Sequence, residues 1–234
     1  MTETVVELAD VTRKYPGNPP VHALRGVSLR VGRGELVGVV GPSGSGKTTL
    51  LNVLGTLDRA DAGTVYIDGK DVSTLDDRQL SALRAHRIGF VFQQFFLSPG
   101  ESALDNVADG LLYTGQPLAE RRRQAEQTLE RVGLADRAHH RPNELSGGQR
   151  QRVAVARALV GHTWVLLADE PTGALDSESG ASVLELLREL HEDGTTIVVI
   201  THDHDVAGVL PRQVHIRDGH IASDDGLPTM WEGR

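Results

Sequence analysis

The residues Leu36-Val-Gly-Val-Val-Gly41-Pro-Ser-Gly-Ser-Gly46-Lys47-Thr48 carry the clearest structural information in this chain. The apolar run to Val40 predicts a buried strand, and Leu50, Leu51 and Leu54 then follow helical spacing. Gly41 to Thr48 matches the pattern G-x-x-x-x-G-K-[ST] between that strand and that helix, which is the context that separates a phosphate-binding loop from a chance match. A glycine-rich turn that binds nothing is the disfavoured alternative.

The loop has the chemistry of an anion site. Glycines allow successive backbone N–H groups to turn inward, and the helix that starts there adds the positive end of its dipole. Lys47 supplies a point charge for the terminal phosphates, and Thr48 would place its hydroxyl on Mg²⁺. The expected nucleotide-binding residues of this segment are Gly41, Pro42, Ser43, Gly44, Ser45, Gly46, Lys47, Thr48 and Thr49.

Composition excludes several classes of protein. The 234 residues carry a net charge of -8, which disfavours a surface that binds nucleic acid non-specifically. There is no Cys, so a disulfide framework and a Cys-ligated zinc are excluded. No secretory leader is recognised at the start of the sequence, and no apolar run approaches the roughly 18 to 20 residues of a membrane span.

Strand and helix patterns alternate along the chain and predict an α/β fold with a mostly parallel sheet. Between about 98 and 160 the strand patterns disappear, and this segment is interpreted as an inserted helical lobe. A single domain is expected over residues 1–223, and residues 224–234 are interpreted as a flexible C-terminal tail. The expected strands are Val5 to Val11, Val27 to Val31, Leu36 to Val40, Thr64 to Ile67, Ile88 to Phe92, Trp164 to Ala168, Thr195 to Ile200 and Gln213 to Ile216.

Two adjacent acids, Asp169 and Glu170, end the apolar run that starts at Val165. In phosphoryl transfer, Asp169 would hold Mg²⁺ and Glu170 would orient and deprotonate the attacking water. Adjacent acids alone also fit a solvated turn. Together with the phosphate loop, however, they predict the second half of a nucleotide site.

Ser146-Gly-Gly-Gln149 precedes a strong helix-forming segment. Ser146 can be read simply as the N-cap of that helix. Two glycines just inside a helix cost about 1 kcal/mol each relative to Ala, so the sequence also suggests that an anion approaches here.

These motifs together resemble the nucleotide-binding subunit of an ATP-binding cassette (ABC) transporter, from about Val5 to Ile221. The resemblance rests on the phosphate loop, Leu145-Ser-Gly-Gly-Gln149, Ala168-Asp-Glu-Pro171, Ala174-Leu-Asp176 and Thr201-His202-Asp203. It implies a core of the P-loop NTPase type with an N-terminal antiparallel β subdomain and an inserted helical lobe. It also implies ATP and Mg²⁺ as ligands and ATP hydrolysis as the activity.

The resemblance assigns further roles. Tyr15 would stack on adenine, with an ordinary surface Tyr as the alternative, and Gln93 would touch Mg²⁺ or the attacking water, with Gln94 as its rival. His202 would contact the γ-phosphate. The signature residues Ser146, Gly147, Gly148 and Gln149, together with Asp176, would act across a dimer. The implied catalytic residues are then Glu170, His202, Gln93 and Lys47, and the implied metal ligands are Thr48, Gln93 and Asp169.

Within the family, the signature of one cassette closes on the nucleotide held by the phosphate loop of another. One copy of each motif occurs here, so the resemblance implies a homodimer or a pair with a homologous cassette. The implied partner is a membrane permease subunit on a separate chain. That pairing implies a peripheral location at the cytoplasmic face of the cell membrane. No nucleic-acid partner is expected.

Several phrases resemble the branch that includes lipoprotein-releasing, macrolide-export and cell-division ATPases, among them Arg87-Ile-Gly-Phe-Val-Phe-Gln93 and Ala103-Leu-Asp-Asn-Val107. Ala174, Ser98 and Arg150 depart from that branch's usual residues. The branch implies ATP-driven export, extraction or mechanical signalling through the permease. Three alternatives stay open: a soluble ABC-type ATPase that acts on a non-membrane macromolecular partner, a cassette that binds nucleotide without hydrolysing it, and a transition-metal site within Thr201 to Asp205.

Overall fold

The computed structural model describes residues 3–161 and 163–226. These residues form two compact units, of which unit 1 comprises 3–73 and 198–226 and unit 2 comprises 74–161 and 163–197. The division falls within the strand β8 (Thr196–Thr201). Both units contain strands and helices, and a parallel strand pair occurs in each, so the predicted α/β class with an antiparallel β subdomain is confirmed.

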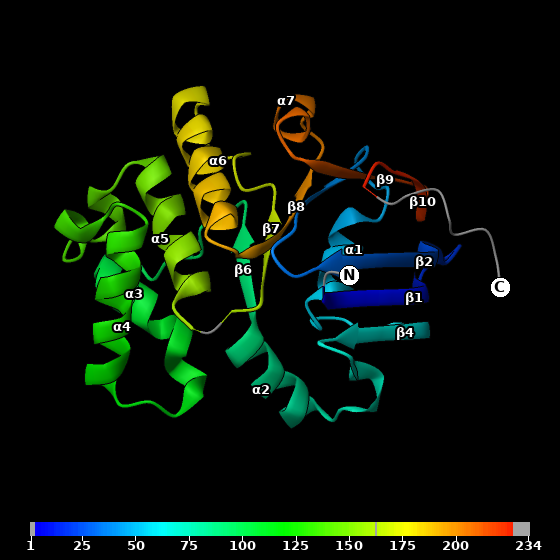
Figure 1. Cartoon of the computed structure of the whole chain (residues 1–234), viewed down its shortest axis with the longest axis horizontal. Coiled ribbons are helices and arrows are strands. Elements are labelled where there is room, and N and C mark those ends of the chain that lie inside the picture. Colours follow the sequence, from blue (N-terminus) through cyan, green and yellow to red (C-terminus); the bar gives the residue numbers. More distant parts are fainter. Residues whose placement is uncertain (1–2, 162, 227–234) are drawn as a thin grey trace. The chain divides into compact units, whose positions relative to one another are not determined.

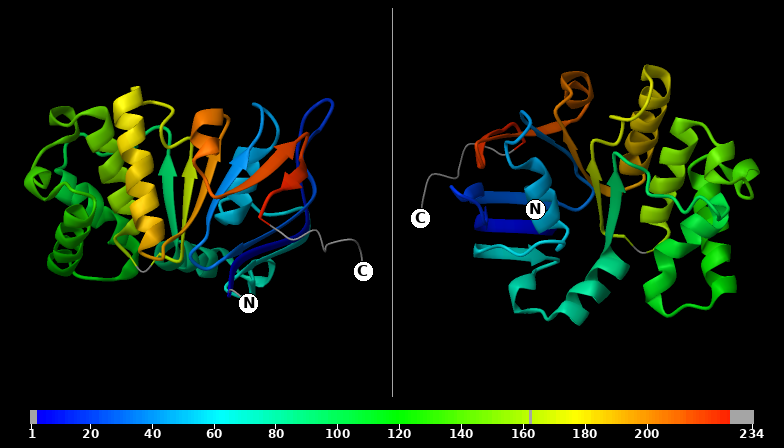
Figure 2. Two further views of the ribbon diagram at one scale, coloured as in Figure 1. Left: turned by 45° about the horizontal axis from the view of Figure 1, so that its top comes forward. Right: turned by 180° about the vertical axis from the view of Figure 1, so that it is seen from behind.

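In unit 1, an antiparallel sheet has the strand order β2-β1-β4-β5. Figures 1 and 2 show β1, β2 and β4 side by side in blue and cyan. Val5, Leu8 and Val11 of β1 are buried, and polar residues of the same strand face outward. The strands are β1 (Thr4–Tyr15), β2 (Val21–Gly32), β4 (Ala62–Ile67) and β5 (Lys70–Asp71).

The second group of strands in unit 1 carries the phosphate loop. All five residues of β3 (Leu36–Val40) are buried, as expected for a central strand of a parallel sheet. β3 pairs in parallel with β9 (Arg212–Arg217), which pairs antiparallel with β10 (His220–Asp224). Unit 1 also holds the helices α1 (Lys47–Leu54) and α7 (His204–Gly208) and the 3₁₀ turn η1 (Val72–Thr74), which begins in it.

One buried ion-pair network fixes the end of unit 1. Arg212 is 8% exposed, and its guanidinium donates to both carboxylate oxygens of Asp224, at 3.0 and 2.7 Å. The same guanidinium bonds Glu35 at 2.5 Å. Asp224, which the sequence places in a loose tail, is therefore the ordered last residue of β10. Asp225 N donates to the Gln213 carbonyl at 3.0 Å, and residues 227–234 of the expected tail lie outside the described residues.

In unit 2, the parallel strands β6 (Ile88–Phe92) and β7 (Val165–Asp169) lie beside helices. Between 98 and 160 the described residues form helices and turns, in agreement with the predicted helical segment, and α3, α4 and α5 pack against one another (Figure 2). The helices are α2 (Asp77–Arg87), α3 (Ala103–Ala108), α4 (Leu118–Arg131), α5 (Gly147–Leu159) and α6 (Ser177–Glu192). The 3₁₀ turns are η2 (Asp109–Thr114), η3 (Ala135–Arg137) and η4 (Pro142–Glu144).

The structure adds elements that the sequence patterns did not predict. β1 and β2 have 12 residues each and are longer than expected, and β5, β10 and α7 were not expected. The helix α2 was also missed, although Asp76 and Gln79 form a capping box at its start. Its apolar signal is weak because Leu80 is its one buried residue.

Candidate functional site

The phosphate loop in unit 1 depends on glycine at three positions. Gly44 and Gly46 have φ angles of 79° and 103°, in the left-handed region that side chains disfavour. A Cβ on Gly46 would collide with the carbonyl oxygen of Ala23, and one on Gly41 with that of Ile216. The path of the loop between β3 and α1 therefore requires glycine at positions 41 and 46 and favours it at position 44.

The side chain of Lys47 points back to the first two residues of this loop. Its side chain is 7% exposed, and Nζ donates to the carbonyl oxygens of Gly41 and Pro42 at 2.8 and 2.9 Å. The hydroxyl of Ser45 is buried and has no hydrogen-bond partner among the described residues. A buried ammonium and an orphaned hydroxyl on one turn fit a group rich in acceptor oxygens, such as a phosphate.

A cavity of about 450 Å³ joins the loop to Tyr15. Gly44, Gly46, Lys47, Thr48 and Thr49 line it together with Tyr15. The remaining lining residues come from β2, the segment before it and the turn after β9: Pro20, Val21, His22, Ala23, Arg25, Asp218 and Gly219. Tyr15, which is expected to stack on adenine, and the phosphate loop therefore line the same cavity in unit 1.

The ring of Tyr15 is held in place by neighbours that sequence reasoning missed. Its hydroxyl donates to Asp58 Oδ2 at 2.7 Å, and the guanidinium carbon of Arg13 lies 4.8 Å from the ring centroid. Arg13 in turn forms ion pairs with Asp58 at 2.7 Å and Asp61 at 2.9 Å. These contacts distinguish Tyr15 from a freely rotating surface side chain. Asp58 and Asp61 lie more than 40 positions from Tyr15 and Arg13, so no local pattern indicates them.

His202 lies in unit 1, just after β8. It lines a cavity of about 280 Å³ with Gly41 and Pro42, the first residues of the phosphate loop, and with His204 and His215. The structure therefore places His202, which is expected to contact the γ-phosphate, beside the phosphate loop. Among residues 3–161 and 163–226, no three His, Asp or Glu side chains are placed to hold a metal ion, and Asp203 caps α7 by accepting from Asp205 N at 2.8 Å. The structure thus offers no support for the transition-metal alternative.

Unit 2 gathers the acidic residues and Gln93 at one sheet edge. β6 and β7 are parallel, and Phe92 is the register partner of Asp169, so Gln93 and Glu170 follow at the same edge. A Cβ on Gly173 would lie 2.9 Å from Gln93 Nε2. The Gln93 amide thus lies against the turn that contains Glu170, and this contact favours Gln93 over Gln94 as the functional glutamine.

Glu170 has a φ angle of 47°, which is uncommon for a residue with a side chain. Its carbonyl oxygen accepts from Gly173 N at 3.0 Å, which closes the turn after β7. Non-glycine residues in this conformation cluster at functional sites, where the surrounding structure must hold them.

At the start of α5, the interpretation of Ser146 as a helix N-cap is confirmed. Ser146 is the N-cap, its Oγ accepts from Gln149 N at 3.2 Å, and Gln149 Oε1 accepts from Ser146 N at 2.9 Å. A Cβ on Gly148 would lie 3.1 Å from Ser179 Cβ, and one on Gly147 3.2 Å from Leu175 Cδ2. The two glycines therefore have a packing reason as well as the anion-related one that the sequence suggests.

Asp176 lies beside this turn as the N-cap of α6. Ser179 donates its backbone N–H and its hydroxyl to the Asp176 carboxylate, each at 2.9 Å. The backbone bond first, and then the hydroxyl bond, lower the pKa of the Asp176 carboxyl. The carboxylate thus stays charged and fixed next to the signature residues.

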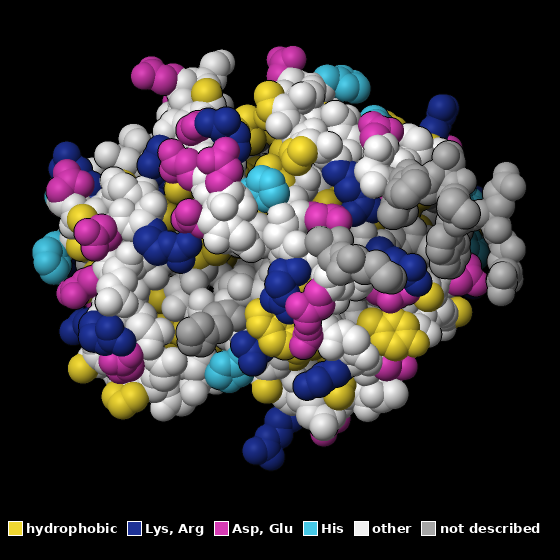
Figure 3. All heavy atoms as spheres, viewed as in Figure 1, with side chains coloured by type: hydrophobic (Ala, Val, Ile, Leu, Met, Phe, Trp, Pro, Cys, Tyr) yellow, Lys and Arg dark blue, Asp and Glu magenta, His cyan; other side chains and the backbone are white. Residues whose placement is uncertain are grey.

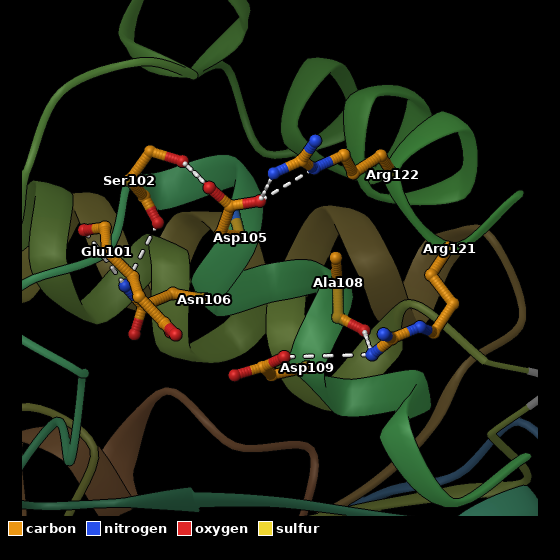
Figure 4. Close-up of polar contacts among 8 residues, drawn as sticks. All are labelled: Glu101, Ser102, Asp105, Asn106, Ala108, Asp109, Arg121 and Arg122. Atoms are coloured by element: carbon orange, nitrogen blue, oxygen red, sulfur yellow. Dashed lines mark hydrogen bonds and ion pairs between the residues drawn. The ribbon is translucent and has the colours of Figure 1, made fainter. Parts of the chain in front are cut away.

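Asn106 fixes the loop 98–102, which contains Ser98, one of the departures from the branch; Figure 4 shows its contacts with Glu101 and Ser102. Asn106 is 2% exposed; it accepts from Ser98 N at 2.7 Å and donates to the carbonyls of Ser98, Glu101 and Ser102 at 3.1, 3.3 and 2.9 Å. Asp105 of α3 pairs with Arg122 of α4 at 2.8 Å. The departure at Ser98 therefore lies in an ordered loop and leaves its backbone bonds intact.

The expected site residues fall into one group in each unit. Tyr15, the phosphate loop and His202 lie in unit 1, whereas Gln93, Asp169, Glu170, Asp176 and the signature residues lie in unit 2. Within unit 2, α5 brings a further polar residue, Gln151, against the turn after Glu170. Sequence reasoning missed it, because a lone Gln in a helix gives no signal.

The outer surface bears on partner classes. Basic and acidic side chains are interspersed over the face drawn in Figure 3 and do not gather into one basic patch. In the part of the chain that the structure describes, none of the helices is long and apolar enough to cross a bilayer.

Comparison with known proteins gives a consistent result. Residues 24–173 match the family described as "ABC transporter". The macrolide export ATP-binding/permease protein MacB of Hyphomonas neptunium is 53% identical over 97% of this chain, which spans 35% of that protein. An ABC transporter ATP-binding protein of Thermotoga maritima is also 53% identical, and the match covers 93% of each chain.

Solved structures agree. The dimeric structure of MJ0796, a bacterial ABC transporter cassette, superposes with a TM-score of 0.84 at 45% identity and covers 94% of this chain and 97% of that one. A second dimeric structure shows the MJ0796 cassette in a post-hydrolysis state bound to ADP and Pi, with the same score, identity and coverage.

Proposed function

The chain belongs to the ABC transporter ATP-binding family, and we propose that it is an ATP-hydrolysing subunit that drives a membrane permease carried on a separate chain. The phosphate loop carries this proposal: Gly41 and Gly46, where a Cβ would collide with backbone oxygens, Gly44 with its positive φ angle, a buried Lys47 and the orphaned hydroxyl of Ser45 form a cradle for a triphosphate. MacB and the pyoverdine exporter PvdT of Pseudomonas putida, 51% identical, are named as export proteins and support an export-type permease. The Thermotoga maritima relative, named as an ATP-binding protein and matched over 93% of its length, supports a separate permease chain, whereas the names of MacB and PvdT place the ATP-binding and permease parts in one protein.

The chain's own residues take the following parts. Backbone N–H groups within 43–46, together with Lys47, bind the phosphates, and Tyr15 stacks on adenine. Thr48, Gln93 and Asp169 supply the hydroxyl, amide and carboxylate oxygens that Mg²⁺ prefers. When bound, Mg²⁺ neutralises charge that builds up on the phosphate oxygens.

In hydrolysis, the oxygen of a water attacks the γ-phosphorus while the bond to the bridging oxygen breaks, so that ADP leaves and phosphate forms. Glu170 orients this water and takes its proton, and His202 contacts the γ-phosphate. Ser146, Gly147, Gly148 and Gln149 of a second cassette close on the same phosphate, with Asp176 beside them. ATP thus holds two cassettes together, and loss of the γ-phosphate contacts releases them. The MJ0796 dimers support this assembly.

The proposed location is the cytoplasmic face of the cell membrane, where the chain is held through the permease. A soluble ATPase that acts on a non-membrane macromolecule is the competing function. A pull-down of tagged chain from its native membranes in mild detergent, followed by mass spectrometry, separates the two. Co-purification of a permease supports the proposal, and recovery of soluble partners alone contradicts it.

The test of the ATP-driven step is Glu170→Gln. This variant keeps the side-chain shape but removes the base, so we expect a dimer that forms with Mg-ATP, persists, and does not form with ADP. Size-exclusion chromatography with light scattering measures it, and Lys47→Ala, which lacks the phosphate-binding ammonium, is the control that stays monomeric. A Glu170→Gln chain that remains monomeric in saturating Mg-ATP would count against the mechanism.

A further inference from the structure

Gln151 is a buried polar side chain that the proposed mechanism does not yet use. It lies on α5, five residues after Ser146, and is 0% exposed. Its Nε2 donates to the carbonyl oxygen of Pro171 at 2.7 Å and lies 3.5 Å from that of Phe92. Its Oε1 has no hydrogen-bond partner among the described residues.

Both carbonyls adjoin a residue of the proposed hydrolysis site. Pro171 directly follows Glu170, and Phe92 directly precedes Gln93. The short bond to Pro171 is the stronger contact, and the longer one to Phe92 places the same amide between the ends of the parallel strands β7 and β6. One side chain on the signature helix therefore touches the backbone next to both Glu170 and Gln93.

The turn at Glu170 needs such support. Its positive φ angle of 47° is strained, and strain of this kind persists only where neighbouring contacts over-determine the backbone. One contact, from Gly173 N to the Glu170 carbonyl, lies within the turn itself. The bond from Gln151 fixes the turn from outside, at the next carbonyl along the chain.

α5 also holds the stretch that follows Gln93. Arg157 donates to the carbonyls of Phe95 and Phe96 at 2.9 and 2.6 Å, and the guanidinium of Arg150 lies 5.1 Å from the Phe95 ring centroid. The helix that begins at the signature thus contacts both sides of Gln93. Displacement of α5 would carry this segment with it.

An apolar side chain at position 151 would avoid the unpaired amide oxygen, but it would leave the Pro171 carbonyl oxygen without its hydrogen bond. A buried amide with an unpaired oxygen destabilises a core, and Met has a similar length without that oxygen. The presence of Gln here is therefore better explained by the bond to Pro171 than by packing.

We propose that Gln151 is a positioning residue for ATP hydrolysis. Through its contacts with the Pro171 and Phe92 carbonyls, a movement of α5 would shift the backbone next to Glu170 and next to Gln93. The inference rests on the proposed function of Glu170 as the base. It also connects two proposed events within one chain. When Ser146–Gln149 closes on the nucleotide of a second cassette, the contacts of α5 would set the position of Glu170, which activates the water.

The test is Gln151→Met in the full chain, with ATPase kinetics and melting temperature measured side by side. We expect kcat to fall by at least about tenfold, because small misplacements of catalytic groups have effects of that size or larger. KM for ATP should stay as in wild type, since the nucleotide-binding residues of unit 1 are untouched. The melting temperature should fall slightly, because the Pro171 carbonyl oxygen loses its hydrogen bond, so kcat is measured at a temperature where both chains are folded.

Thr128→Val is the matched control. It removes another buried bond from a side chain to a backbone carbonyl, that of Thr128 to Gln124 at 2.8 Å in α4, and should leave kcat unchanged. In a Glu170→Gln background, Gln151→Met should still allow the ATP-dependent dimer, because it acts on hydrolysis and not on closure.

Wild-type kcat in a folded Gln151→Met chain would overturn the inference, and so would a raised KM with unchanged kcat. If Gln151→Met does not fold, Gln151→Asn serves instead, because its shorter amide falls short of Pro171 and should give the same loss of kcat. A wild-type chain that does not hydrolyse ATP refutes the proposed function, whereas an active wild type with a fully active Gln151 variant refutes this inference alone.

Discussion

Tyr15 shows how neighbouring residues prepare a single side chain for its role. The Asp58 carboxylate fixes the phenol hydroxyl and Arg13 lies over the ring, so the ring is oriented within the cavity that it shares with the phosphate loop. A pre-oriented ring loses less conformational entropy when a base stacks on it. The structure therefore supports the adenine-stacking role, which stays a prediction.

Tyr15→Ala should raise KM for ATP by about fivefold to a hundredfold, because stacking on a base is worth about 1–3 kcal/mol. The kcat at saturation should be unchanged, since stacking is the same in the ground and transition states. Steady-state ATPase kinetics measure both. Tyr113→Ala is the control, because Tyr113 is 84% exposed in unit 2. If Tyr15→Ala keeps the wild-type KM, the ring is a surface feature.

At the scale of an element, the start of α5 combines two functions that can be separated. Ser146 caps the helix through a reciprocal pair with Gln149, and Gly147 and Gly148 let this end approach Leu175 and Ser179. A capped N-terminus that is packed against the next helix is structurally sufficient. Its proposed contact with the γ-phosphate of a second cassette is an additional role.

Ser146→Asp separates capping from the proposed phosphate contact, because it should preserve the first and abolish the second. Aspartate is as good an N-cap as serine and its charge favours a helix N-terminus, so the thermal stability should equal that of wild type. The same charge would repel a γ-phosphate, so the ATP-dependent dimer and ATP turnover should be lost.

Ser146→Ala is the companion variant, which should lose about 1 kcal/mol of stability with the cap. Chemical denaturation and light scattering measure the two properties. Normal dimerisation by the Ser146→Asp variant would limit Ser146 to its capping role.

At the scale of the whole molecule, each unit holds part of the site. Unit 1 provides the phosphate loop, Tyr15 and His202, and unit 2 provides Gln93, Glu170 and the signature residues. The proposed dimer pairs the loop of one chain with the signature of another. Each active site would then be built from two chains.

A mixing experiment tests this arrangement. Lys47→Ala has a defective loop and an intact signature, whereas Ser146→Asp has the reverse, so each variant alone should be inactive. A mixed dimer contains one intact composite site, so mixing the two should restore ATP turnover to part of the wild-type level. The control is each variant at the same total concentration. Activity that does not exceed the sum of the separate variants contradicts composite sites.

The amino-acid sequence alone predicts the phosphate loop, Asp169 at the end of β7 with Glu170 after it, the helical segment within 98–160 and the family. These features depend on contiguous residues: a strand, a glycine turn and a helix start are set by local backbone preferences and by neighbours a few positions away. It misjudged the lengths of β1 and β2, missed α2 and placed Asp224 in a tail. Long-range strand pairing sets the lengths of β1 and β2, and the ion pair with Arg212 orders Asp224, whereas α2 gives a weak apolar pattern because Leu80 is its one buried residue.

Only the tertiary structure decided which side chains support the site. Gln151 meets Pro171 across 20 positions, Tyr15 meets Asp58 across 43, and Arg157 meets Phe95 across 62. Such contacts arise where separate elements pack, and the sequence around a single Gln, Asp or Arg does not indicate its distant partner. Local chemistry therefore identifies the groups that would bind and react, whereas the packing of strands and helices determines which residues hold them in position.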